Sequence, residues 1–350
     1  MRRRFRRGCA AVADDGELLL ASIEDYLGPG ENRFFARGYQ RAEYGVRDVV
    51  ITPDEGREPV VRARVDVGYP ADWSTKDGVD QRPHLSTVDA LVLGVQLAEA
   101  HLAHGLGLDA ADRAHARVRK AVLRAGGEPQ EDLLGIPLTA RLVKSTETGR
   151  SPMTSVYDCT VGNLRIRCEI EHRAGPRTKT AGIYHTLDDV LGAGTARYYG
   201  AGFKVRRHHI RDVHVDPDAH TARAGVHFSP EVTTPGQGIG GASQPSVTFV
   251  DAFVVNLQLV QVLLYELDSL SRGTSNTLWM MQTVLDAPAT PLPLPEGPGR
   301  ALPATAALTA KRLLPLRGGT WRSVDIEAGL GGVGIRCGFA HELPAAKVTA

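Results

Sequence analysis

The feature that most constrains this chain is an internal repeat, in which short motifs occur twice in the same order. The segment Arg33–Tyr39 resembles Arg197–Phe203, and the residue numbers differ by 164. Four more pairs of blocks follow: Arg47–Val49 with Arg211–Val213, Val88–Leu97 with Val250–Leu259, Leu138–Arg141 with Leu308–Lys311, and Ile166–His172 with Ile335–His341. Five matched blocks with small drifts in offset indicate two copies of one fold. We therefore expect the copies to superpose, with Asp89 on Asp251.

Each copy is predicted to contain two alternating strands, one long helix and then several further strands. The strands expected in the first copy are Arg47–Ile51, Val60–Val67, Leu138–Lys144, Ser155–Cys159 and Leu164–Ile170. Those expected in the second are Ile210–Val215, Ala222–Phe228, Leu278–Leu285, Ala310–Leu316 and Ser323–Ile326. The Pro-rich run Ala287–Pro303 is typical of an exposed loop.

The two predicted helices are apolar on nearly every side, which is typical of a helix buried in protein. The second, Phe249–Leu267, is long enough to span a membrane. Polar residues that are costly in lipid interrupt it, namely Asp251, Asn256, Gln258, Gln261 and Glu266. We therefore expect it to lie inside the protein.

A sheet wrapped around a buried helix is the hotdog fold, so the sequence predicts an α+β, tandem duplicated (double) hotdog. Each copy is expected to be an antiparallel sheet around one central helix, with the two sheets joined edge to edge. The expected boundaries are a basic, disordered N-terminal extension (1–21), a first copy (22–175), a linker (176–194) and a second copy (195–350).

The charge balance argues against nucleic acid as the main partner, since 41 basic and 40 acidic residues give a net charge of +1. The arginine-rich start, Met1–Arg7, is interpreted as a solvated tail. A signal peptide is rejected, because Asp14 and Asp15 interrupt the apolar stretch that would have to follow.

The four cysteines, Cys9, Cys159, Cys168 and Cys337, form no C-x-x-C pair. A zinc site and a disulfide framework are therefore not expected. The sequence is interpreted as that of a cytoplasmic protein with free thiols.

Each predicted helix carries an acid and a glutamine seven residues apart: Asp89 with Gln96, and Asp251 with Gln258. Seven residues is nearly two helical turns, so each pair shares one face. A capping box with Ser86 or Thr248 explains the acids structurally. In the functional interpretation, each acid lies near a cleft where the free N–H groups of the helix start polarise a thioester carbonyl. Both interpretations stay open, and the glutamines could equally be core amides bonded to backbone.

His84 lies in the loop that enters the first helix, and the matching position of the second copy is Ser246. Acid–base chemistry favours a group that titrates near neutral pH, so His84 is a candidate partner for Asp251 across the junction of the copies. An exposed loop histidine is the alternative.

Two other patterns are considered and set aside. The cluster His208, His209, His214 and His220 is not expected to bind a metal, because His208 and His209 face opposite ways on a strand. The glycine-rich segment Gly236–Gly241 lacks the strand–turn–helix context of a phosphate loop. It is instead expected to move over the entrance of the second site.

Three stretches of the sequence resemble the avirulence protein D (AvrD) family, and the resemblance covers the chain from about Ser22 to its end. They are Asp25–Phe35, Val250–Leu259 and Ser275–Trp279. The resemblance implies the making of syringolides from a β-ketoacyl thioester and a sugar. It extends to the A-factor biosynthesis proteins, which lead to γ-butyrolactones, and to polyketide dehydratase domains, which are double hotdogs. The H-x-x-x-G-x-x-x-x-P motif of those dehydratases is absent, which argues against simple dehydration.

The resemblance implies a secondary-metabolite enzyme that transfers an acyl group from a β-ketoacyl thioester to a polyol hydroxyl, or condenses and cyclises the product to a lactone. The thioester would be carried by acyl-carrier protein or CoA, and the chain can form a homodimer. No cofactor, metal, nucleic acid or membrane is expected. A dehydratase or cyclase on a carrier-bound polyketide, and a protein that only binds an acyl or lactone ligand, are the alternatives.

Asp251 is expected to act as general acid or base, with Asp89 and His84 as the other catalytic candidates. Gln258, Asn256, Gln96 and Thr248 are the expected substrate-binding residues. An Asp251→Asn variant is expected to fold and to lose turnover.

The second helix is expected to line the working site, because Asn256 and Gln261 replace Gly94 and Glu99 of the first. Neutral amides bind a polar substrate without the desolvation cost of a charge. Gln258→Leu is therefore expected to reduce turnover more than Gln96→Leu. Steady-state turnover and melting temperature of both variants, compared with wild type, test this; equal losses would contradict it.

Overall fold

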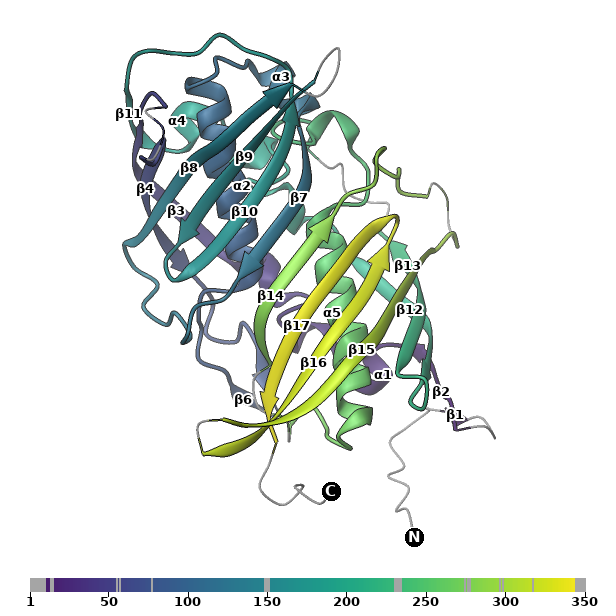
Figure 1. Ribbon diagram of the computed structural model, residues 1–350. Helices are drawn as coiled ribbons and strands as arrows, with labels where there is room; N and C mark the ends of the chain where they lie inside the picture. The colour runs from purple at the N-terminus through teal and green to yellow at the C-terminus, as the bar shows by residue number, and fades with distance from the viewer. Residues whose placement is uncertain are drawn as a thin grey trace.

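Two antiparallel sheets, each curved around one long helix, join edge to edge in the computed structural model of the chain (Figure 1). The structure describes residues 11–12, 16–54, 56, 58–76, 78–147, 152–229, 235–273, 275, 278–295, 297, 299–316 and 318–343. The arginine-rich start and Cys9 lie outside the described residues, as do Asn276 and Thr277. The strand order is β1-β2-β12-β13-β15-β16-β17-β14-β7-β10-β9-β8-β4-β3-β11.

The elements of the first half, in chain order, include one long central helix and most of the strands around it. They are β1 (Ala11–Val12), β2 (Leu18–Ser22), α1 (Glu24–Leu27), β3 (Glu43–Ile51), β4 (Val61–Gly68), the hairpin β5 (Thr75–Lys76) and β6 (Val79–Asp80), α2 (Thr87–His104), α3 (Ala110–His115), β7 (Arg117–Arg124), β8 (Ile136–Glu147), β9 (Met153–Val161) and β10 (Leu164–His172).

The second half repeats this order. It contains β11 (Gly182–Thr186), α4 (Asp188–Leu191), β12 (His208–Asp216), β13 (Thr221–Phe228), α5 (Phe249–Leu267), β14 (Trp279–Asp286), β15 (Leu302–Leu316), β16 (Gly319–Leu330) and β17 (Val333–Glu342). Short 3-10 turns at Gly30–Asn32, Gly38–Arg41, Gly194–Ala196, Gly202–Lys204 and Gly241–Ser243 complete both halves. The prediction of an α+β double hotdog is thus confirmed.

The two sheets meet where β7 pairs with β14, and Val122 is directly opposite Val284. These two valines occupy equivalent positions in the repeat, so the junction relates the copies by an approximate two-fold axis. A second equivalent pair, Tyr39 and Phe203, stacks with ring centroids 6.3 Å apart and an interplanar angle of 20°. Repeat-equivalent residues therefore face each other at two separate places.

The N-terminal strands of the two copies are exchanged. β2 precedes the first copy in sequence but pairs with β12 of the second, while β11 precedes the second copy but pairs with β3 of the first. The short helices α1 and α4 follow these strands at equivalent positions. β2 thus lies partly within the expected extension 1–21, and β11 and α4 lie within the expected linker 176–194. Five-residue strands carry too little alternation to be recognised without their distant partners.

The central helices begin at the capping boxes that their sequences predict. Ser86 and Thr248 each form a complete capping box, with Asp89 and Asp251 as the third helical residues. From Val88 to Leu102 every residue of α2 is buried, and α5 is buried from Phe249 to Val260. α5 passes as a membrane span by length and composition, but 83% of its apolar window is buried inside the protein. This agrees with the core helix expected from the sequence.

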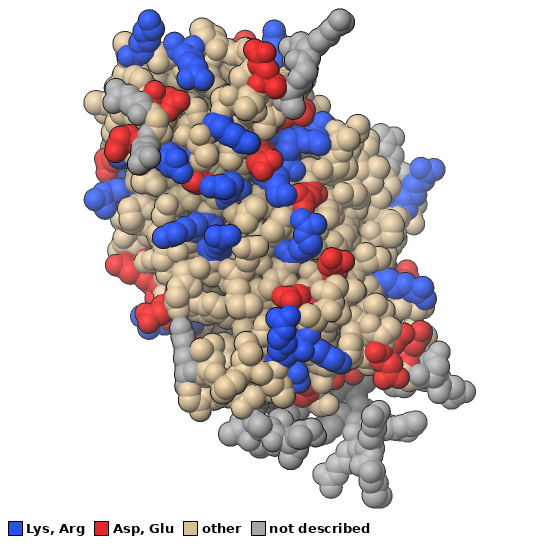
Figure 2. Space-filling view, viewed as in Figure 1, with Lys and Arg blue, Asp and Glu red and all other residues tan. Residues whose placement is uncertain are grey.

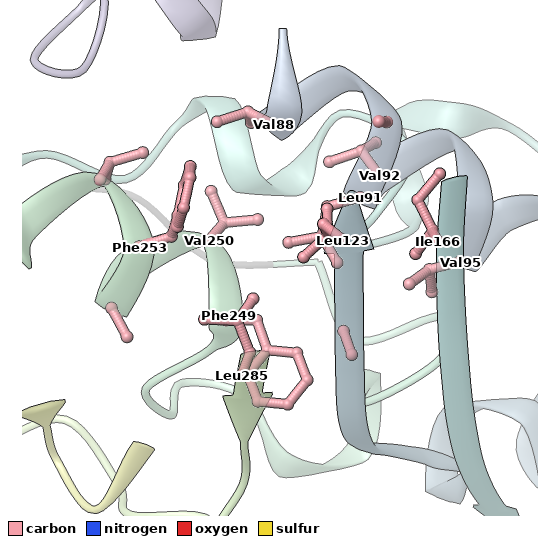
Figure 3. Packing of buried hydrophobic residues seen from close by; sticks show 14 of the residues in the cluster. Val88, Leu91, Val92, Val95, Leu123, Ile166, Phe249, Val250, Phe253 and Leu285 are labelled. Atoms are coloured by element: carbon pink, nitrogen blue, oxygen red, sulfur yellow. The ribbon is translucent and has the colours of Figure 1, made fainter. Parts of the chain in front are cut away.

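Both helices contribute to one hydrophobic cluster across the junction. Figure 3 shows Leu91 of α2 and Phe253 of α5 in this cluster, together with Leu123 of β7 and Leu285 of β14. β7 was not among the strands expected from the sequence. Its basic residues are half-buried or exposed, and the buried residues Val118, Ala121 and Leu123 do not alternate strictly.

Basic and acidic side chains are interspersed over the outer face of the sheet, as Figure 2 shows. This distribution matches the near-zero net charge. The face in this view presents no continuous surface of one sign that would attract a polyanion.

The exchanged strand β2 is expected to stabilise the second half. Leu20 is 2% exposed and its strand pairs with β12, so Leu20→Ala removes buried apolar contacts and should lower the free energy of unfolding by about 2–5 kcal/mol. The neighbouring exposed residue gives the control: Ala21→Ser should change it by less than about 0.5 kcal/mol. Urea unfolding of wild type and of both variants measures these changes in free energy. Equal unfolding midpoints for Leu20→Ala and wild type would contradict the exchange.

Candidate functional site

Two equivalent sites lie where the central helices begin, and each is built around one buried acid. Asp89 is fully buried at the start of α2, and Asp251 is 1% exposed at the start of α5. In both, the carboxylate accepts a hydrogen bond from the backbone N–H of its cap residue, Ser86 or Thr248, as capping requires. Both acids therefore cap their helices. The other contacts of the two carboxylates distinguish the two sites.

Asp251 is held by positive and polar partners. Arg206 donates to its Oδ2 at 2.5 Å, His208 Nε2 lies 2.8 Å from its Oδ1, and the Thr248 hydroxyl donates at 2.8 Å. Burial alone would raise the pKa of Asp251, but the Arg206 charge and the His208 hydrogen bond outweigh it and bring the pKa to about 2. Asp251 is therefore a carboxylate locked in a buried ion pair.

Asp89 instead accepts from two tyrosines. The Tyr44 hydroxyl donates to Oδ1 at 2.7 Å, and the Tyr69 hydroxyl donates to Oδ2. Burial is the largest influence on Asp89 and raises its pKa, while these neutral donors oppose the rise. Tyr44 and His208 occupy equivalent positions in the repeat, and Arg206, which brings the positive charge to Asp251, has Ala42 as its equivalent.

The start of α2 opens into a cavity of about 390 Å³ between the copies. One end is formed by the segment from His84 to Thr87, which leads into the first turn of the helix. The body of α5 supplies an apolar wall, which includes Phe253, Leu257 and Val260. The cavity thus combines the helix start of one copy with the helix body of the other.

The equivalent space at the start of α5 is only about 60 Å³. The glycine-rich segment Gly236–Gly241 fills it: Ile239 is fully buried, and the Gly240 N–H donates to the Ala116 carbonyl at 2.7 Å. Movement of this segment over an entrance stays a prediction; in the structure its residues Gly238 and Ile239 are buried. The two sites are therefore unequal in size, and the larger one lies at α2.

His84 lines the large cavity and does not belong to the hydrogen-bonded group around Asp251. Its Nδ1 lies 3.3 Å from the Arg82 carbonyl oxygen, and its ring meets Trp73 edge to face at 5.3 Å. The histidine that contacts Asp251 is His208, from the same copy. The sequence did not single out His208 for this role, although its alignment with Tyr44 in the repeat was a usable signal.

The two helix glutamines bind the exchanged segments. Arg33 donates to Gln258 Oε1 at 2.7 Å, and Arg197 donates to Gln96 Oε1 at 3.2 Å. Each bond joins one copy to the helix of the other, and both arginines belong to the first repeated motif. Asn256 donates to the Ala252 carbonyl at 2.9 Å, within its own helix. These amides thus make internal contacts, and a substrate-binding role for them stays a prediction.

Among the described residues no group of three or more His, Cys, Asp or Glu side chains could hold a metal ion. His208 bonds Asp251, and His209 lies 3.0 Å from the Ser229 hydroxyl. Cys159, Cys168 and Cys337 are buried free thiols, and burial raises the pKa of each.

The duplicated sheets, the buried helices and the paired sites at their N-terminal ends define a double-hotdog protein. Comparison with known sequences adds the family: the model of the Pseudomonas avirulence D protein (AvrD) matches residues 18–344, and the chain belongs to the AvrD family. The expected family is thus confirmed. No curated protein matches the sequence.

Several solved structures are similar to this chain at low identity. A tesB protein of Mycobacterium avium subspecies paratuberculosis is 9% identical, with a TM-score of 0.37 and coverage of 81% of this chain and 93% of that chain. The 12:0-ACP thioesterase of Umbellularia californica is 12% identical, with a TM-score of 0.36 and coverage of 74% and 88%. The dehydratase domain of the polyketide PpsC from Mycobacterium tuberculosis is 12% identical, with a TM-score of 0.30 and coverage of 77% and 86%.

The two acids should respond differently to the same substitution. Asp251→Asn leaves the buried Arg206 charge without its carboxylate and should lower the free energy of unfolding at pH 7 by about 3–5 kcal/mol. Asp89→Asn keeps neutral partners around an amide and should cost only about 1–2 kcal/mol. The sequence-based expectation that Asp251→Asn folds normally is thereby revised.

The pH dependence gives a further check on Asp251. Because its pKa in the folded protein lies below the ordinary value of 3.8, its ionised form stabilises the fold above about pH 4. That contribution is lost as the pH falls through about 2. The gap in unfolding free energy between wild type and Asp251→Asn should therefore shrink with acidification, as chemical denaturation at several pH values would measure. A constant gap would contradict the ion pair.

Proposed function

We propose that this protein is a hotdog-type enzyme that acts on an acyl thioester, with the acyl chain in the large cavity between the copies. The observation that carries the proposal is the composition of this cavity. It joins an apolar wall from α5 to the polar N-terminal end of α2. Family membership supports the same substrate class, since the AvrD resemblance implies a β-ketoacyl thioester.

The start of α2 is suited to hold the thioester carbonyl. The first N–H groups of a helix have no partner within the helix. The Ser86 hydroxyl accepts from the Asp89 N–H, and the Ala90 N–H bonds the Ser86 carbonyl, so Thr87 and Val88 have the remaining N–H groups. Such groups stabilise negative charge that develops on a carbonyl oxygen.

His84 is the proton carrier in this proposal. The Arg82 oxygen can only accept, so in the neutral ring Nδ1 carries the proton and Nε2 keeps a lone pair. His84 would take the proton of an attacking polyol hydroxyl, whose oxygen then bonds to the thioester carbon. The thiol leaves with the proton that His84 returns. The product is an ester of the polyol, which a further condensation can close to a lactone.

Asp89 acts as a positioning residue here. Its carboxylate fixes the first turn of α2 through the cap, and Tyr44 and Tyr69 hold that carboxylate in place. Asp251, proposed from the sequence as general acid or base, is given the corresponding structural role at the smaller site, because its ion pair keeps it ionised. Gln96, Gln258, Asn256 and Thr248 then support the two helices.

The role of His84 is tested by comparing equivalent positions of the two copies. His84→Gln should lower kcat by about 10²–10⁴-fold with a β-ketoacyl thioester and a polyol, because it removes the proton carrier and retains polarity. Ser246→Ala, at the equivalent position of the smaller site, should retain activity. Mass spectrometry of the product and the rate of thiol release are the measurements.

The same assay separates the competing functions. Loss of water from the acyl chain would identify a dehydratase, and binding of the thioester with no thiol release or change in mass would identify a binding protein. Full activity in His84→Gln would refute the assigned proton carrier.

A further inference from the structure

The large cavity contains three cations, of which Arg33 has an arginine, Arg197, at the equivalent position of the other copy. Arg33 and Lys76 line it together with Arg272. The Arg33 side chain is 4% exposed, and the carboxylate with which it pairs is that of Glu24, at 3.7 Å and half exposed. Lys76 Nζ donates to the Ser275 carbonyl at 3.2 Å, and no ion pair joins it to a described residue. Positive charge therefore accumulates at this end of the cavity.

The repeat equivalent of Arg33 has different charged neighbours. Arg197, the equivalent of Arg33, lies 2.9 Å from Asp188 and 4.0 Å from the fully buried Glu99. Glu99 also pairs with Arg113 at 3.4 Å. At the place equivalent to that of Arg33, two buried arginines thus face two carboxylates.

The large cavity has neutral groups at the positions equivalent to Glu99 and Arg113. Gln261 is the repeat equivalent of Glu99, and Ser275 is the repeat equivalent of Arg113. Gln261 lines the cavity beside Tyr265. The two copies thus share the arginine but differ at this position, which is a carboxylate in one copy and an amide in the other.

Arg272 lies close enough to affect both other cations. Burial lowers the pKa of Arg33 to about 10; the charges of Glu24 and Glu31 oppose this shift, and the charge of Arg272 adds to it. Burial, and then Arg272, lower the pKa of Lys76. Like charges gathered in a partly buried space repel one another, and a bound anion would relieve that repulsion.

The other charged residues that line the cavity are Arg82, Glu128 and Glu131, and the Arg82 carbonyl contacts His84. Glu131 pairs with Arg82 at 2.7 Å, and Glu128 lies in the same wall. These acids do not appear among the charges that shift the pKa of Arg33 or Lys76. The ion pairs of the described residues thus join Glu131 to Arg82 and Glu24 to Arg33.

We propose that Arg33 and Lys76, with Arg272 beside them, form a subsite for a phosphate group of the ligand that occupies the large cavity. Arg33 Nε donates to the Pro29 carbonyl and Nη1 to Gln258 Oε1, so its remaining N–H groups would bind the phosphate. The ammonium of Lys76 adds a compact positive charge. The phosphate belongs either to the phosphopantetheine arm of the thioester or to a phosphorylated acceptor. The binding site does not depend on the proposed reaction, whereas its place in that reaction rests on the proposed function.

The binding claim is tested with inorganic phosphate alone, by titration calorimetry of the full chain at constant ionic strength. Wild type should bind phosphate, and Lys76→Met should weaken binding by about 10-fold or more. Gln261→Glu should have a similar effect, because it restores next to Arg33 the carboxylate that Glu99 places next to Arg197. Lys120→Met, which removes a cation on β7 outside the cavity, is the control and should bind as wild type does.

Two thioesters of the same acyl chain then distinguish the sources of the phosphate. A CoA thioester carries phosphate, and an N-acetylcysteamine thioester does not. If the carrier supplies the phosphate, Lys76→Met should raise KM about 10-fold or more for the CoA thioester only. If a phosphorylated polyol supplies it, the KM for that polyol should rise with either thioester.

The outcomes that overturn the subsite are distinct from failure of the proposed reaction. Absence of phosphate binding to wild type, or equal binding by wild type, Lys76→Met and Gln261→Glu, would refute it. If no thioester is turned over, the proposed function fails, while the phosphate titration still decides whether the subsite exists. Melting temperatures of the variants confirm that each is folded before its binding is interpreted.

Discussion

Burial of two helices that are apolar on nearly every side is the constraint on which the rest of this structure depends. A single curved sheet covers one side of such a helix and leaves the other side exposed. Here the remaining side is covered by the other copy, through the β7–β14 junction and the exchanged N-terminal segments. The two copies therefore share one hydrophobic cluster.

The exchanged segments also explain polar residues that would otherwise be costly in the core. A buried amide or guanidinium must find a hydrogen-bond partner. Arg33 with Gln258, and Arg197 with Gln96, satisfy one another across the copies. The glutamines thus help to hold the halves together, and the repeated arginines mark the segments that are exchanged.

Once the copies were joined, the two sites could diverge without loss of the fold. At α5, a carboxylate pairs with Arg206 and His208, and the glycine-rich segment fills the space in front of the helix. At α2, two tyrosines hold the carboxylate and a large cavity remains. The charges also differ between the copies: the buried Glu99 pairs with Arg197 and Arg113, whereas Gln261 takes its place in the cavity that cations line. This division supports an assignment of ligand binding to the larger site.

The sequence by itself determined the duplication, the two buried helices and the place of Asp89 and Asp251 in capping boxes. These follow from local spacing and from the comparison of one half of the chain with the other. Only the tertiary structure decided which partners those acids have, because Tyr44, Tyr69, Arg206 and His208 lie some 20 to 45 residues from them in the chain. It also decided which site keeps a cavity, since that depends on how the Gly236–Gly241 loop packs and on exchanged strands whose partners belong to the other copy. A pattern read along the chain contains no information on such distant contacts until the fold brings them together.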